Sequence, residues 1–248
     1  MDFKLQQKTI ECSAEIIYEF AFENKNVNKN LLEYFSINVD DFKNANSKGK
    51  LQIIKEATKS LYGKNAILFK QKQAEIDQLL TKRQKEIEKI LSQTFNLLIN
   101  KTIKVYLGVC PICPRYLSDF SFDICIFESN EGILQTIIHE LIHFYWFAKM
   151  ENMGYKLSAQ DKECPSLPWL ITEIVVDSIF KNTNLKQFLF NQEPAYHVFY
   201  SATINGQNLI ESFNNMFAAS QNIEEFISAT MEFMEENKTE LANLKINF

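Results

Sequence analysis

The 248-residue chain contains few of the residues that interrupt helices. It has only 6 glycines and 5 prolines, while 46% of its residues are hydrophobic and 23% are charged. Hydrophobic and charged fractions of this size are ordinary for a globular protein. Because glycine and proline are the residues that most often build turns, their scarcity favours a helix-rich chain. The length is sufficient for one well-buried core.

The chain also lacks an excess of positive charge and a long apolar run. Its net charge is −5, and no basic run of the kind that binds nucleic acid stands out. Polar residues interrupt every apolar stretch before it reaches the length of a membrane span. The first residues do not show the basic and then apolar pattern of a secretory signal. We therefore expect a cytoplasmic protein with no nucleic-acid or membrane partner, and its oligomeric state stays open.

The cysteines are odd in number and widely spaced, which does not resemble a disulfide framework. Cys110 and Cys113 form a CxxC pair, a spacing used by redox pairs and by zinc sites. A zinc site would need two more ligands, and the sequence contains no second CxxC. We expect these cysteines to be reduced, partly buried thiols without a chemical role.

Apolar spacing predicts helices over most of the chain. An apolar stripe at helical spacing predicts one long surface helix over residues 65–99; its members are Phe69, Ile76, Leu80, Ile87, Leu91, Phe95 and Leu98. Similar patterns predict helices over residues 10–22, 130–150, 168–181, 207–219 and 223–244, and another helix start at Glu193-Pro194. Alternating apolar and polar residues predict strands over 102–109 and 121–127.

Histidine is scarce, yet two of the 3 histidines lie four positions apart, at His139 and His143. Residues four apart share one face of a helix, so both imidazoles can reach one metal ion. Glu140 lies beside them and can contact water at the metal. This is the HExxH zinc motif. The alternative is a hydrogen-bonded structural cluster, which is less favourable because the surrounding helix is apolar and buried polar groups need partners.

A catalytic zinc ion takes three protein ligands and leaves a position for water. The best third candidate is Glu173, which shares a helix face with Asp177 in an apolar segment. Zinc gives Glu173 a partner, and the second nitrogen of a ligand imidazole gives one to Asp177. The alternative is a Glu173 that faces solvent in the first turn of its helix. The competing third ligands are Asp161, Glu163 and His197.

His139-Glu140-x-x-His143 followed by a helical Glu173-x-x-x-Asp177 resembles the gluzincin metallopeptidases, the thermolysin-like superfamily. The resemblance covers roughly residues 101–200. In that group the third ligand is a glutamate on a later helix, and an aspartate four residues on supports the first histidine. The resemblance implies a fold that is α+β and helix-rich. A small, mainly antiparallel sheet would pack over the helix that carries HExxH, and the C-terminal part would be helical.

The resemblance also implies two further features of the site. An edge strand, here Ser121–Phe127, would border the cleft and pair with the substrate backbone. A tyrosine or histidine would donate a hydrogen bond to the oxyanion, with His197, Tyr196 and Tyr200 as candidates in that order; the alternative is a Tyr/His cluster satisfied in the core. The sequence departs from the pattern in three ways. Two residues separate Leu170 from Glu173, Ile174 stands where many gluzincins have glycine, and the 30 positions from His143 to Glu173 exceed the spacing in thermolysin-like enzymes.

The sequence therefore predicts a zinc-dependent metallopeptidase that acts on a peptide or protein. Zn²⁺ activates a water molecule, Glu140 accepts its proton as general base, and the proton later passes to the leaving amine. Residues 1–100 would be a helical region of unknown role, and residues 101–248 the catalytic domain. Two alternatives remain open. One is a zinc hydrolase of a small non-peptide amide, and the other is a non-enzymatic protein with a structural zinc site.

Overall fold

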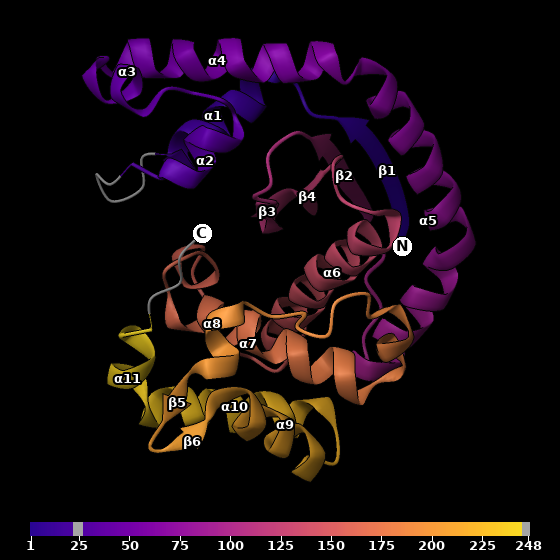
Figure 1. Cartoon of the computed structure of the whole chain (residues 1–248). Helices are drawn as coiled ribbons and strands as arrows, with labels where there is room; N and C mark the ends of the chain where they lie inside the picture. The colour runs from indigo at the N-terminus through magenta and orange to yellow at the C-terminus, as the bar shows by residue number, and fades with distance from the viewer. Residues whose placement is uncertain (22–26, 245–248) are drawn as a thin grey trace. The chain divides into compact units, whose positions relative to one another are not determined.

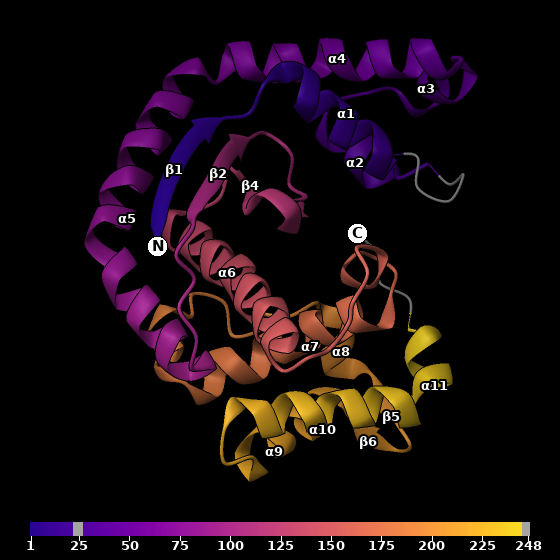
Figure 2. The same cartoon turned by 180° about the vertical axis from the view of Figure 1, so that it is seen from behind.

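The computed structural model describes residues 1–21 and 27–244. Two compact units share the chain. The unit that we call the sheet unit comprises Asp2–Lys82 and Thr102–Asn130, and the unit that we call the helical unit comprises Arg83–Lys101 and Glu131–Asn247 together with Met1. Figure 1 and Figure 2 show the elements of both units from opposite sides. Residues 22–26 and 245–248 lie outside the described part of the chain.

The sheet unit contains a four-stranded sheet in the order β1-β2-β4-β3. Its strands are β1 (Asp2–Gln7), β2 (Thr102–Gly108), β3 (Arg115–Tyr116) and β4 (Ser121–Cys125). The prediction of a helix-rich α+β fold is confirmed, but the prediction of a mainly antiparallel sheet is wrong. β1 pairs with β2 and β2 with β4 in parallel, and only β3 runs antiparallel to β4. Alternating apolar residues reveal a strand and not its direction, and β1 reaches β2 through the helical crossover that parallel pairing requires.

The expectation that Ser121–Phe127 forms an edge strand is also wrong. β4 is an inner strand, because Phe122 pairs with Val105 of β2 on one side and with Arg115 of β3 on the other. All five residues of β4 are buried. The segment between β2 and β4 turns back to form β3, which covers the second edge of β4. The outer strands of this sheet are β1 and β3.

Helices joined by short loops complete the sheet unit. Their bounds are α1 (Ile10–Ala21), α2 (Lys29–Tyr34), α3 (Val39–Asn44), α4 (Ser47–Lys64) and the first part of α5 (Ala66–Phe95), with a short 3-10 turn η2 (Leu117–Asp119) before β4. Three of the helices begin at an asparagine whose side chain accepts a backbone N–H of the first turn. α1 packs against α2 and α4, as both views show (Figures 1 and 2). Phe22, at the end of the predicted helix 10–22, lies outside the described residues.

The helical unit is built around two long buried helices, α6 and α7. Its elements are the second part of α5, α6 (Asn130–Asn152), η3 (Gln160–Lys162), α7 (Leu167–Asn182), η4 (Asn184–Phe188), α8 (His197–Ser201), α9 (Leu209–Ala219), α10 (Ile223–Glu236), α11 (Lys238–Ala242) and the hairpin β5 (Thr203–Ile204) and β6 (Gln207–Asn208). α7 packs against α9, α10 and α11 (Figures 1 and 2). The later helices therefore cover α7 and leave it enclosed.

Two details of the predicted helices are corrected. The long helix over 65–99 is confirmed as α5, but it ends at Phe95, and Leu98 is 74% exposed instead of belonging to the buried stripe. Asn96 takes a left-handed φ of 45°, which ends the helical repeat. The predicted helix start at Glu193-Pro194 is wrong as well, because α8 begins only at His197.

Within residues 1–21 and 27–244, no helix combines the length and the apolar character needed to cross a bilayer. The assignment of catalysis to residues 101–248 stays a prediction. The packing of the sheet over α6 also stays a prediction, because it concerns the placement of one unit against the other.

Candidate metal centre

The candidate ligands lie on α6 and α7, which are both apolar around most of their circumference. Such helices belong in the interior of a domain, and every residue of α7 from Trp169 to Phe180 is buried. Ser166 caps α7 by accepting the backbone N–H of Trp169, and Pro168 stands in the first turn. The two helices are neighbours in both views (Figures 1 and 2).

His139, His143 and Glu173 meet between α6 and α7. The Oε2 atom of Glu173 lies 3.2 Å from Nε2 of His139 and 3.3 Å from Nε2 of His143. One ligand atom from each residue lies within 4.8 Å of the other two. Among the described residues, this is the single group of three or more His, Cys, Asp or Glu side chains with such a geometry. The three predicted ligands therefore form a group that can hold a metal ion.

The hydrogen bond on the far side of His139 fixes the proton of its neutral imidazole. Its Nδ1 lies 3.1 Å from the carbonyl oxygen of Pro194. A carbonyl oxygen only accepts, so Nδ1 is the atom that carries the proton. The neutral ring then presents an unprotonated Nε2 to the carboxylate of Glu173. Two lone-pair atoms that face each other at this distance repel, unless a cation or a second imidazole proton lies between them.

The two distances from Glu173 to the imidazoles fit a tetrahedral metal site. Zinc bonds of ~2.0–2.2 Å place the ligand atoms of a tetrahedral site about 3.3–3.6 Å apart, close to the observed 3.2 and 3.3 Å. Burial supports the same conclusion, because His143 is 0% and Glu173 3% exposed. A carboxylate enclosed to this degree is expensive unless a cation or hydrogen-bond donors compensate its charge. A divalent cation compensates it without the need to protonate a buried imidazole.

Glu140 follows His139 directly on α6 and is 5% exposed. On a helix it neighbours His143, three residues later. Glu140 and Glu173 therefore bring two buried carboxyl groups to the same part of α6 and α7 as two imidazoles. The role of Glu140 as general base stays a prediction.

The structure places Asp177 one turn along α7 from Glu173, fully buried. Its Oδ1 accepts a hydrogen bond from the hydroxyl of Tyr200 at 2.6 Å and lies 2.7 Å from Nζ of Lys181. Its Oδ2 accepts from Nδ2 of Asn214 at 3.1 Å. The ring nitrogen of His139 meets the Pro194 carbonyl instead. That Asp177 supports a ligand imidazole by accepting its hydrogen bond directly stays a prediction.

The other predicted residues lie in the segment before and within α8. The side chain of His197 is 86% exposed, and its Nδ1 lies 2.7 Å from Oε2 of Glu193. Tyr196 is half-buried and packs edge-on against Phe199. Burial and the hydrogen bond to Asp177 raise the pKa of the Tyr200 phenol. The roles of His197 and Tyr196 in binding an oxyanion stay predictions.

Two competing ligands lie apart from the group. Asp161 is half-buried, and its carboxylate accepts the backbone N–H of Ser158. The bond from the Ser158 hydroxyl and this backbone bond lower the pKa of Asp161. Glu163 is exposed. Neither residue joins the group of His139, His143 and Glu173.

Sequence reasoning missed the segment that runs along α6 from Phe190 to Ala195. Backbone N–H groups of Phe190 and Asn191 both donate to Oε1 of Gln135 at 2.7 Å, one turn before His139. The carbonyl of Pro194 then meets His139 itself. Main-chain groups have no signature in a sequence. The only usable signal was Gln135, a polar side chain one helical turn from the motif.

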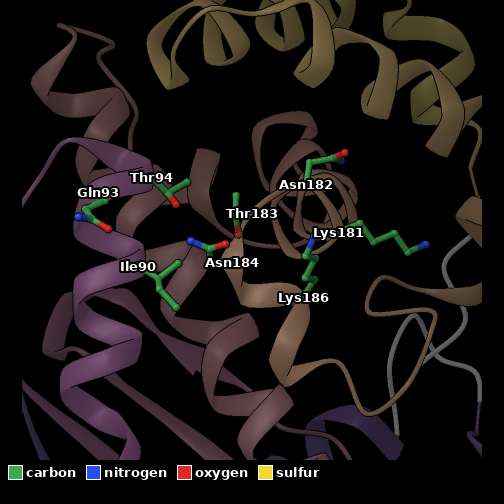
Figure 3. A pocket seen from close by; sticks show the side chains of 8 residues that line it. All are labelled: Ile90, Gln93, Thr94, Lys181, Asn182, Thr183, Asn184 and Lys186. Atoms are coloured by element: carbon green, nitrogen blue, oxygen red, sulfur yellow. The ribbon is translucent and has the colours of Figure 1, made fainter.

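A polar surface hollow lies in the same unit but uses none of the three ligands. Gln93 and Thr94 of α5 line it together with Asn182, Thr183 and Asn184 at the end of α7. Lys181 also lines this hollow, and Figure 3 shows the end of its side chain pointing away from Gln93 and Thr94. Its ammonium group forms an ion pair with Asp177.

Neither cysteine of the CxxC pair forms a disulfide. Cys110 is buried, and burial raises its pKa to about 12. A thiol with this pKa is protonated at neutral pH and is a poor nucleophile. The expectation that Cys110 and Cys113 have no chemical role stays a prediction.

Comparison with known proteins gives no relative. No protein-family model matches the chain, and neither a curated protein nor a solved structure is significantly similar to it. The group on α6 and α7 is therefore the observation on which function must rest.

Proposed function

We propose that this chain is a zinc-dependent hydrolase of the gluzincin type, and that its substrate is a peptide or protein. The observation that carries the proposal is the meeting of His139, His143 and Glu173 at ligand spacing, with Glu140 beside them on α6. A site that only stabilises the fold has no need of a carboxylate next to its ligands. The order of the ligands along the chain is that of the gluzincin motif, which supports a peptide substrate.

Each residue of the site has a different role. His139 and His143 offer neutral nitrogen ligands, and Glu173 offers a negative charge that offsets the charge of a dication. Zinc held there supplies Lewis acidity, which lowers the pKa of water to ~7 and polarises a carbonyl group. Glu140 accepts the proton of the attacking water and later returns it to the leaving amine. Glu140 is buried, and a low local dielectric strengthens the electrostatic interactions of a buried group.

The decisive variant is Glu140→Gln, which keeps size and polarity but removes the proton acceptor. At matched zinc occupancy, we expect peptide hydrolysis to fall by at least ~10²-fold, the lower range for a positioned acid–base group. Zinc content and thermal stability should equal those of the wild type. The matched control is Glu131→Gln, an exposed position at the start of the same helix, which should retain full activity.

A peptide library screened with zinc-loaded wild-type protein provides the substrate for this comparison. Glu140→Gln with wild-type activity would contradict the mechanism. A wild type that holds zinc but cleaves no peptide would contradict the peptidase proposal and favour the small-amide or structural alternatives. A wild type that holds no metal would contradict the proposal as a whole.

A further inference from the structure

Asp177 is a buried carboxylate with a complete set of partners. Tyr200 and Lys181 meet its Oδ1 at 2.6 and 2.7 Å, and Asn214 meets its Oδ2 at 3.1 Å. Lys181 lies one turn later on α7, and its ammonium group compensates the negative charge of Asp177. These contacts hold a fixed negative charge at the hydroxyl of Tyr200.

The hydroxyl of Tyr200 both donates and accepts a hydrogen bond. It donates its proton to Asp177 and accepts the backbone N–H of Ala195 at 3.2 Å. The backbone of Tyr200 is fixed too, since its carbonyl accepts from Nδ2 of Asn208 at 2.8 Å. The single hydroxyl proton thus points at Asp177, which leaves none for an oxyanion.

The same peptide group that donates to Tyr200 also accepts from His139. This group joins Pro194 to Ala195, and its carbonyl oxygen lies 3.1 Å from Nδ1 of His139 while its N–H meets Tyr200. Hydrogen bonds in a chain polarise one another, by ~10–30% per bond. A pull by Asp177 on the tyrosine proton therefore makes the Pro194 carbonyl a better acceptor for the imidazole.

We propose that Tyr200 is a positioning residue for the metal centre, which couples Asp177 to the ligand His139 through the Pro194–Ala195 peptide group. The inference rests on the proposed function, because it treats His139 as a metal ligand. The coupling keeps the proton of His139 on Nδ1 and keeps Nε2 directed at Glu173. This indirect link differs from the direct contact between Asp177 and an imidazole that the sequence predicts, and it directs the hydroxyl proton of Tyr200 to Asp177 and not to an oxyanion.

Tyr200→Phe tests the coupling, because it removes the hydroxyl and keeps the ring. Groups that orient metal ligands typically contribute 10–100-fold to metal affinity, and Tyr200 acts from one step further away. We expect zinc affinity, measured by competition with a chelator, to fall by about 10-fold. Tyr155→Phe is the matched control, since Tyr155 is half-buried in the same unit and its hydroxyl has no partner among the described residues. Its affinity should stay at the wild-type value.

A double variant separates coupling from a general loss of structure. Tyr200→Phe and Asp177→Asn break the same chain of hydrogen bonds. The double variant should therefore lose no more zinc affinity than the weaker-binding single variant. Losses that multiply would show that the two residues act independently and would overturn the proposal.

A third experiment determines which ring nitrogen of His139 carries the proton in metal-free protein. The chain has 3 histidines, so two-bond proton–nitrogen NMR spectra of ring-labelled protein give the tautomer of each. In the wild type, His139 should carry its proton on Nδ1, and in Tyr200→Phe both tautomers should appear. A wild type with the proton on Nε2, or a folded Tyr200→Phe with an unchanged tautomer and unchanged zinc affinity, would overturn the coupling. A wild type that shows the expected tautomer yet binds no zinc would contradict the proposed function alone.

Discussion

Two clusters of buried charged side chains, one in each unit, are satisfied in opposite ways. In the sheet unit, the ammonium of Lys8 lies 2.9 Å from Oδ1 of Asp123. It also lies over the rings of Tyr106 and Tyr116, at 4.7 and 4.9 Å from their centroids. In the helical unit, the carboxylate of Glu173 instead meets two imidazoles that are positive only when protonated.

The difference shows which buried charge indicates a ligand. Lys8 and Asp123 have opposite charges, so the pair is electrically complete and needs nothing from outside. The group on α6 and α7 brings acceptors together, and a cation is the partner that makes the arrangement favourable. The charges of the groups that meet, and whether they donate or accept, therefore indicate a ligand site better than burial does.

The largest expected effect follows from removal of a ligand. His143→Ala should abolish stoichiometric zinc binding, because two remaining ligands do not form the three-ligand site that catalytic zinc requires. Metal analysis of the purified variant, after dialysis against zinc and then buffer, measures this. Lys8→Met is the contrasting variant and should retain its zinc. Zinc retained by His143→Ala, or lost by Lys8→Met in folded protein, would break the distinction between the two clusters.

A smaller effect, on stability, is expected when the ion pair of Lys8 and Asp123 is broken. Asp123→Ala should lower the free energy of unfolding by about 3–5 kcal/mol, since it leaves the ammonium of Lys8 buried without its partner carboxylate. Denaturant titration measures the change. The double variant Lys8→Met/Asp123→Leu should be more stable than Asp123→Ala, because it removes both charges. Equal stability of the two variants would mean that the loss comes from packing and not from charge.

The part of the site that is local in sequence could be predicted. His139 and His143 are four residues apart, and this spacing alone places them on one helix face. Glu173 could be predicted because a carboxylate in an apolar helix needs a partner, and the structure brings it to both histidines. The buried stripe of α5 was equally visible up to Phe95, where the left-handed Asn96 ends the helix.

The rest depends on contacts that no spacing reveals. The Pro194 carbonyl is a main-chain group, so nothing in the side chains pointed to its bond with His139. Asp177 was recognised as needing a partner, but Tyr200 comes to it from a different helix. The direction of the strands was missed for a similar reason. Alternation places Ile103 and Val105 on one face, and it contains no information on which strand pairs with which.

The central claim is that His139, His143 and Glu173 together hold one metal ion. The most direct measurement is a crystal structure of zinc-loaded protein, with data collected on both sides of the zinc absorption edge. We expect one anomalous peak per chain, at ~2.0–2.2 Å from the two Nε2 atoms and from an oxygen of Glu173. A zinc ion bound elsewhere, or an imidazole of His139 or His143 that donates a proton to Glu173 with no metal between them, would contradict the account.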